Sequence, residues 1–363
     1  MKDSIDFGTT KVSSLFSKLL MPTLLGMVSS ALFVITDGIF VGRGLGSDAL
    51  AAVNIVAPLF LINTGIGLMF GVGASVVASI HLSHGKPKTA RINVTQAVIA
   101  LSMLVAAFSA LIVWRAPGVA CLLGSSERLL APAVEYIYGA VPFFVFSAML
   151  SAGMFYIRLD ASPRYAMMCN VVPALLNIVL DYLFIFVFHW GVIGAAVATS
   201  LGYIAGAGMV LWYMLMMGRT IKLCRVKTHL RSLRMTRRNV GYMCRLGFPS
   251  LLCEAAIATM MFAGNYVFIA YLGEDGVAAY SIACYVFPII FMVYNAIAQS
   301  AQPILSYNYG ARLTRRVSSA LRMALFTALG SGVMFLLIMY FFAPDIVSLF
   351  IPAGFPANTI AVD

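Results

Sequence analysis

Apolar segments long enough to cross a lipid bilayer constrain this chain more than any other feature of its sequence. A membrane-spanning helix needs roughly 20 mostly apolar residues. Short stretches with glycine, proline or charged residues separate the segments that meet this requirement. These segments are 19–42, 52–80, 92–114, 131–157, 165–188, 191–217, 246–272, 277–301 and 317–343. The sequence therefore predicts an all-α integral membrane protein with nine transmembrane helices.

The composition favours burial in lipid over folding around a soluble core. Hydrophobic residues make up 61% of the 363 residues and charged residues only 10%, against about 45–50% and about 25% in soluble domains. The net charge of +11 does not indicate nucleic acid, because the charges lie in loops between apolar segments. The six cysteines lack the spacing of metal ligands. We expect no cofactor and no disulfide framework.

The basic residues alternate between the two sides of the predicted bundle. Lysines and arginines gather at the N-terminus and in the loops after the second, fourth, sixth and eighth segments. The remaining loops carry only Arg43, Arg115 and Arg128. Because positively charged loops stay in the cytoplasm, we expect the N-terminus to be cytoplasmic. The first apolar segment is long and has no small-residue cleavage site after it, so we expect no removable signal peptide.

An internal similarity indicates a repeat. LGSDALAA at 45–52 resembles LGEDGVAA at 272–279, an offset of 227 residues (272 less 45), and Pro22 meets Pro249 at the same offset. Parallel repeats are a known plan of transporters. We predict a six-helix N-lobe at 1–218, a basic cytoplasmic linker at 219–241 and an incomplete C-lobe with helices 7–9 at 242–363. Relative to a full plan of six plus six helices, the last three are missing.

Four acidic residues lie within the predicted spans, namely Asp37, Glu135, Asp181 and Glu254. A charge at the middle of a membrane costs at least about 2.5–3.5 kcal/mol on insertion scales, so such residues usually face the interior of a bundle and have a function. We expect Glu135 to lie at the outer interface. Glu254 is predicted to bind a cationic substrate or a second proton, unless it reaches the inner interface.

Asp37 and Asp181 are predicted to share a site with two further polar residues. From the helical rise of about 1.5 Å per residue, Asp37, Asn177, Asp181 and Thr199 lie at one level, roughly 8–17 Å below the outer surface. Carboxylate, amide and hydroxyl oxygens suit a hard cation such as Na⁺. The two carboxyl groups could instead hold a proton, because neighbouring acids away from water favour a neutral partner. A purely structural hydrogen-bonded link between helices is the alternative.

Several motifs, in the same order along the chain, resemble the multidrug and toxic compound extrusion (MATE) family. VITDGIFVGRGLGSDALAAVNIVAP (34–58) resembles the family's first helix, and LNIVLDYLFIF (176–186) and WGVIGAAVATSLG (190–202) resemble its fifth and sixth. LGFPSLLCE (246–254) resembles the seventh, and QSAQPILSYNYGARLTRRV (299–317) the loop after the eighth. The detail is similar to the DinF/MepA-like bacterial branch.

The resemblance implies two six-helix lobes around a central cavity and no enzymatic activity. It implies export of small cationic or amphipathic drug-like compounds by alternating access, in exchange for Na⁺ or H⁺. It places Asp37, Asn177, Asp181 and Thr199 in a cation or proton site of the N-lobe, and Glu254 matches an acid that some members carry in helix 7. We expect a monomer in the bacterial inner membrane. Family members carry a glycine in the loop after helix 4, where this chain has RLDASPR.

Three other functions stay open from the sequence. The chain could be a truncated remnant or scaffold that does not transport. It could be a flippase for lipid-linked oligosaccharides, although such a protein is expected to carry many basic residues in its spans. Two buried aspartates also occur in intramembrane proteases, but the sequence lacks their GxGD motif, and it lacks HExxH and GxSxG.

Overall fold

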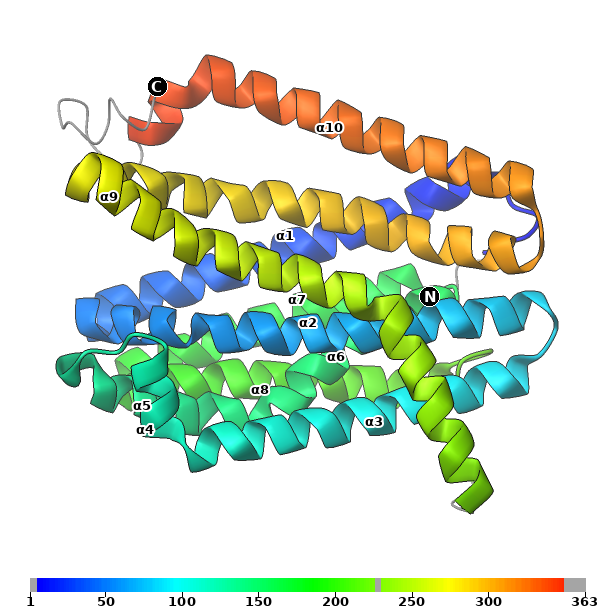
Figure 1. Cartoon of the computed structure of the whole chain (residues 1–363), viewed down its shortest axis with the longest axis horizontal. Coiled ribbons are helices and arrows are strands. Elements are labelled where there is room, and N and C mark those ends of the chain that lie inside the picture. Colours follow the sequence, from blue (N-terminus) through cyan, green and yellow to red (C-terminus); the bar gives the residue numbers. More distant parts are fainter. Residues whose placement is uncertain (1–4, 226–229, 349–363) are drawn as a thin grey trace.

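The computed structural model describes residues 5–225 and 230–348, and the regular elements in this part are helices. Figure 1 shows the long helices lying side by side as one bundle, with the loops gathered at its two ends. The elements are α1 (Val12–Leu45), α2 (Ser47–Ser83), α3 (Pro87–Trp114), α4 (Ala116–Leu122), α5 (Glu127–Ala140), α6 (Phe144–Leu159), α7 (Pro163–Asp181), α8 (Gly191–Trp212), α9 (Leu230–Gly310) and α10 (Thr314–Ser348).

Seven helical stretches in the described residues are long and apolar enough to cross a membrane, by length and composition. They are 12–45, 48–83, 87–114, 127–159, 163–187, 191–217 and 314–342. They contain the cores of predicted spans one to six and nine, so these predictions are confirmed as apolar helices. The stretch 127–159 joins α5 and α6 through one 3₁₀ turn at Val141–Phe143, where Pro142 cannot donate a helical hydrogen bond.

The predicted count of nine spans is not confirmed. Predicted spans seven and eight, 246–272 and 277–301, both lie within α9, and the helical assignment runs through the turn predicted at 273–275. Figure 1 shows α9 as two limbs, one yellow-green and one gold, that run past each other in opposite directions. Residues 349–363 of the predicted C-lobe lie outside the described residues.

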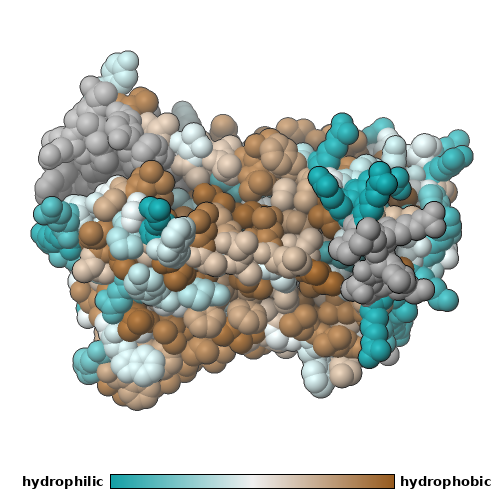
Figure 2. Space-filling view, turned by 60° about the horizontal axis from the view of Figure 1, so that its bottom comes forward, coloured by the Kyte–Doolittle hydropathy of each residue, from teal (hydrophilic) through white to brown (hydrophobic). Residues whose placement is uncertain are grey.

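The surface pattern is that of a protein surrounded by lipid. Figure 2 shows a broad hydrophobic belt over the middle of the bundle and hydrophilic residues at its two ends. None of the most apolar window of α10 is buried in the protein, and large side chains such as Leu329 and Phe341 are exposed along it. Exposed apolar surface of this extent is stable only in an apolar solvent.

Helix α2 lies at the centre of the packing, against α9, α6, α3 and α5. The contact with the first limb of α9 is close enough to involve the backbones. A Cβ added at Gly73 would collide with the backbone of Met243, and one added at Gly247 would collide with the backbone of Met69. Small residues allow such close approach between helices in membranes, where packing drives association.

Candidate functional site

Three packed helices of the N-terminal part carry the four residues predicted to share a site. Asp37 lies on α1, Asn177 and Asp181 on α7, and Thr199 on α8, and α7 packs against both α1 and α8. A glycine makes the second contact close, because a Cβ at Gly202 would lie 3.3 Å from the Pro173 carbonyl oxygen and 3.5 Å from Cβ of Asn177. The backbones therefore approach each other at the level of the polar residues.

The structure brings these four side chains together. The carboxyl groups of Asp37 and Asp181 lie next to each other, and Asp181 also lies next to the Asn177 amide. Nδ2 of Asn177 donates a hydrogen bond to Oγ1 of Thr199 at 3.4 Å. Asn177, Asp181 and Thr199 are buried, and Asp37 is half-buried. Matching depths along separate helices thus identified residues that are neighbours in space.

Four oxygens of this cluster are buried without a hydrogen-bond partner among the described residues. They are Oδ1 of Asp37, Oδ1 of Asn177 and both carboxyl oxygens of Asp181. A buried acceptor with no partner costs about 1–3 kcal/mol, and more when it is charged. Two carboxyl groups in contact cannot both remain ionised away from water without a positive neighbour. The cluster therefore has the acceptors and the charge to hold a small cation or a proton.

Two tyrosines of the site were not found from the sequence. Tyr136 of α5 is buried close to Thr199 and within electrostatic range of both aspartates. Tyr203 of α8 lies close to Ser147 and within electrostatic range of Asp37, and its ring meets Phe33 edge-on at 6.4 Å between centroids. Tyr203 follows Thr199 by four residues, so both lie on one helix face. That spacing was the available signal, and no spacing within one helix indicates Tyr136.

The backbone widens directly after the site. Helix α7 ends at Asp181 and continues as a π-helical segment from Tyr182 to Val187. Such wide turns are rare and occur often at functional sites, because they change the direction of neighbouring side chains. Phe186 in this segment packs edge-on against Phe40 of α1, with 5.7 Å between ring centroids. The sequence predicted a helix here but not its change of pitch.

Glu254 does not join the four-residue cluster. It is buried in the first limb of α9 against α2, where a Cβ at Gly65 would lie 3.3 Å from Cβ of Glu254. Among the described residues, no other acidic side chain lies beside it at this contact between α2 and α9. Its role in substrate or proton binding stays a prediction.

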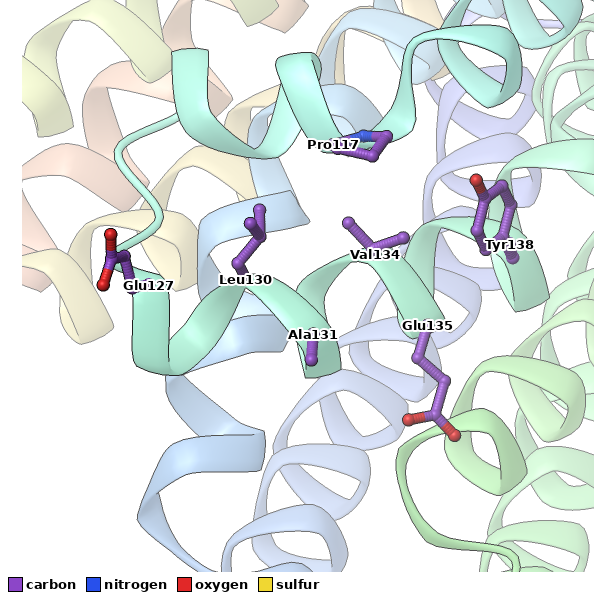
Figure 3. Close-up of a pocket in the computed structure, with 7 residues that line it drawn as sticks. All are labelled: Pro117, Glu127, Leu130, Ala131, Val134, Glu135 and Tyr138. Carbon is purple, nitrogen blue, oxygen red and sulfur yellow. The ribbon is translucent and has the colours of Figure 1, made fainter.

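Glu135 lies at the surface, at the rim of a pocket of about 500 Å³ between α4 and α5. Figure 3 shows Leu130 and Val134 directed toward Pro117 across this pocket, while Glu135 points away from Pro117. Its exposure agrees with the predicted interfacial position.

The comparison with family models decides the classification. The MatE model matches residues 22–183 and 249–354, which form most of the chain. The chain belongs to the MATE family of transporters. As a member of this family with seven apolar helical stretches, it is a multi-pass membrane protein.

Relatives of the chain are similar over most of its length. The FAD transporter of Shewanella oneidensis is 24% identical over 358 residues, which cover 96% of this chain and 77% of that protein. The multidrug export protein MepA of Staphylococcus aureus is 23% identical over 301 residues, covering 81% of this chain. The match spans 64% of MepA, which is less than two thirds of its length.

Solved structures of MATE transporters share the fold. A MATE family transporter of the MOP superfamily in an outward-facing conformation has a TM-score of 0.88 and 22% identity, covering 100% of this chain and 80% of its own. A MATE crystal structure in complex with MaD5 has a TM-score of 0.87, also with 22% identity and the same coverage. The chain thus has the architecture of this family over the residues that it contains.

Proposed function

We propose that this MATE protein exports small cationic or amphipathic compounds by antiport with Na⁺ or H⁺. The observation that carries the proposal is the group of four buried, unpartnered oxygens on Asp37, Asn177 and Asp181. Such a group is costly unless a cation or proton occupies it. Binding of an ion here changes the charge at a contact between helices. Such a site can couple ion binding to helix movement.

The chemistry of coupling follows from the two carboxyl groups. A bound cation or proton would hold Asp37 and Asp181 together and keep α1 against α7, where the structure has it. Without it, the two acids repel each other and the α1–α7 contact is weakened. A ligand shifts a conformational equilibrium by its differential affinity for the two states. Binding and release of the ion would therefore bias the position of α1.

The second part of the proposal is alternating access between two lobes, with boundaries at 1–218, 219–241 and 242–363. Oγ of Ser75 donates a hydrogen bond to Oε1 of Gln302 at 3.3 Å, and these residues are 227 apart. Helix α3 begins at Pro87 and α10 at Thr314, again 227 apart (314 less 87). Equivalent residues of two repeats touch only near the axis that relates them. These pairs support a parallel repeat.

The start of the linker is anchored on the N-lobe, which supports the boundary after residue 218. Asp160 accepts hydrogen bonds from the backbone amides of Arg219, Thr220 and Ile221 at 2.7–2.9 Å. Its Oδ2 also accepts one from the Tyr213 hydroxyl at 2.8 Å. A single buried carboxylate thus holds the first residues of the linker against the end of α8.

Orientation, location and oligomeric state belong to the same proposal. The N-terminus and the basic linker lie in the cytoplasm, the protein resides in a bacterial inner membrane, and it acts as a monomer. The distribution of lysines and arginines supports the orientation. We call the end with the N-terminus and these basic loops the basic end of the bundle.

Two substrate classes are worth separating. MepA is named a multidrug export protein, which supports organic cations. The relative that covers 96% of this chain is named an FAD transporter, which supports a flavin nucleotide as the second candidate. A flippase is less favoured, because Arg158 is the single arginine or lysine buried among the residues whose burial is described.

The test is transport by the reconstituted protein. Proteoliposomes with the wild-type chain should export a fluorescent organic cation when either a sodium gradient at fixed pH or a pH gradient without sodium is imposed. Asp37→Asn should abolish this response, with at least about a hundredfold loss, since removing a charge essential to coupling leaves no driving step. Asp48→Asn is the matched control, because Asp48 is exposed and pairs with Arg128 away from the site. Unchanged export by Asp37→Asn would exclude the assigned role.

A binding measurement separates the transporter from a scaffold that keeps only the ion site. Sodium or proton binding to the purified chain can be followed by intrinsic fluorescence without any transport. Ion binding that is lost in Asp37→Asn, with no export by the wild type, would favour the scaffold. Competition of FAD with the dye in the same vesicles would favour the flavin substrate.

A further inference from the structure

A groove at the basic end of the bundle has features of a ligand site that the coupling mechanism does not use. It has a volume of about 750 Å³ and lies where α2 and α9 end and α10 begins. Its polar part is formed by Arg312, His84, Thr314 and Ser318. Residues of the proposed N-lobe and C-lobe therefore face one cavity.

Arg312 has an unusual backbone. Its φ angle is 57°, a left-handed conformation that non-glycine residues adopt at a cost. The position 227 residues earlier is Gly85 (312 less 227), which has a φ of 68° in the loop after α2. The two loops thus share one backbone geometry, and glycine would suit both of them. A strained arginine in place of glycine suggests that its side chain has a function.

The positive charge of Arg312 is not neutralised within the described part of the chain. The ion pair found there joins Asp48 and Arg128, and the Arg312 side chain is exposed. The neighbouring Arg316 is engaged, since it donates to Oδ1 of Asn308 at 2.9 Å and to the carbonyl oxygen of Phe7 at 3.0 Å. Arg312 is therefore available to an anion in the groove.

The groove is apolar on its other side. Ile80 of α2 and Val317 and Leu321 of α10 line it. The candidate span of α10 begins at Thr314 by length and composition, and Val317 and Leu321 lie one and two helical turns along it. Leu321 is exposed. We therefore expect the polar end of the groove at headgroup level and its apolar end beside the acyl chains.

We propose that this groove binds an anionic phospholipid, with its phosphate on Arg312 and its acyl chains along α10. Basic pockets between helices at the cytoplasmic side suit such headgroups. The hydroxyls of Thr314 and Ser318 supply further donors for the phosphate oxygens. A soluble phosphate compound would use the polar end alone and leave the apolar wall unfilled. Because the groove joins the ends of α2 and α10, the bound lipid stabilises the contact between the two lobes at this end.

The experiment compares lipid binding and thermal stability of the full chain in vesicles. Phosphatidylcholine vesicles with and without phosphatidylglycerol serve as probes, and unfolding is followed by intrinsic fluorescence. Phosphatidylglycerol should stabilise the wild type, and Arg312→Gly should bind it about fivefold more weakly, the loss expected for one basic contact to an anionic headgroup. In pure phosphatidylcholine the same variant should be at least as stable as the wild type, because glycine relieves the strain.

Matched variants make the result decisive. Arg312→Lys keeps the charge and should keep most of the preference. Arg312→Asn tolerates the left-handed backbone and replaces the glycine variant if that one does not fold. Arg315→Gln removes a neighbouring exposed charge that does not line the groove, and it should weaken binding less than Arg312→Gly does. An equal loss in Arg315→Gln, full retention in Arg312→Gly, or equal stabilisation by free glycerol phosphate would each overturn the proposed lipid site.

Discussion

The first helix of each proposed repeat carries one acid within its apolar length, but the two acids differ in position and surroundings. At the offset of 227, Asp37 corresponds to Gly264 and Glu254 corresponds to Met27. Asp37 meets Asp181 in a cluster that also holds polar groups of α7 and α8, whereas Glu254 lies against Gly65 of α2 with no second acid beside it among the described residues. The proposed repeat therefore applies to the backbone. Asp37 and Glu254 do not lie at equivalent positions of the two halves.

The contacts that these two segments make with neighbouring helices also differ, in how closely the backbones approach. Helix α1 approaches α7 at Gly26, where a Cβ would lie 3.0 Å from the end of a side chain, Nδ2 of Asn170. The first limb of α9 approaches α2 so closely at Gly247 that a Cβ would collide with backbone. A side chain can move aside and a backbone cannot. We therefore expect α1 to be the adaptable contact and α9 the rigid one.

The largest expected effect distinguishes the Asp37–Asp181 cluster from Glu254. Asp181→Asn should lower ion-driven export by at least about a hundredfold, because it removes one of the two carboxyl groups proposed to hold the ion. Glu254→Gln should lower export by no more than about tenfold, because Glu254 shares its position with no second acidic side chain of the described residues. Initial export rates in matched proteoliposomes measure both. Equal losses of export in the two variants would contradict the proposed difference between the two halves of the protein.

The next effect concerns the rigid contact. Gly247→Ala should destabilise the protein by about 1–3 kcal/mol, because the added methyl group overpacks the contact with α2. Gly241→Ala, in the same helix, has nothing within 4 Å of the added Cβ and should stabilise by about 0.5–1 kcal/mol. Thermal unfolding of the two variants in one detergent gives the comparison. Gly26→Ala should lie between them, and a loss as large as that of Gly247→Ala would contradict an adaptable α1 contact.

A smaller effect is expected within the cluster itself. Thr199→Ala removes the acceptor of the hydrogen bond from Asn177, which costs about 0.5–1.5 kcal/mol. Ion affinity should fall by a factor of about 2–10, while export at saturating ion is retained. Titration of ion-dependent fluorescence measures the shift. Complete loss of export would instead show that Thr199 is as important for coupling as either aspartate.

The smallest expected effect concerns a strained backbone position to which we assign no function. Ala161 has a φ of 62° in the loop after α6, a left-handed conformation that favours glycine. Ala161→Gly should raise stability by up to about 1 kcal/mol, because relief of about 1–2 kcal/mol is offset by the greater chain entropy of glycine. Export and lipid preference should not change. A variant that also lost the preference for phosphatidylglycerol would remove the contrast with Arg312.

The sequence by itself determined the membrane class, seven of the spans and the family, and it predicted the four residues of the candidate site. Length and apolarity are enough to define a membrane helix, and the helical rise gives depth without any knowledge of packing. For this reason Asp37, Asn177, Asp181 and Thr199 were matched before their contacts were known. The start of α3 and the start of α10 also follow the offset that the sequence repeat indicated.

Only the tertiary structure decided which side chains meet. Tyr136 reaches the cluster from α5, and no pattern along one helix reports the rotation of another. The pitch change after Asp181 and the left-handed backbone of Arg312 depend on local packing, which neither hydropathy nor spacing encodes. Periodicity along one helix gives the depth of a residue, whereas rotation and contact between helices arise from close packing across the whole bundle.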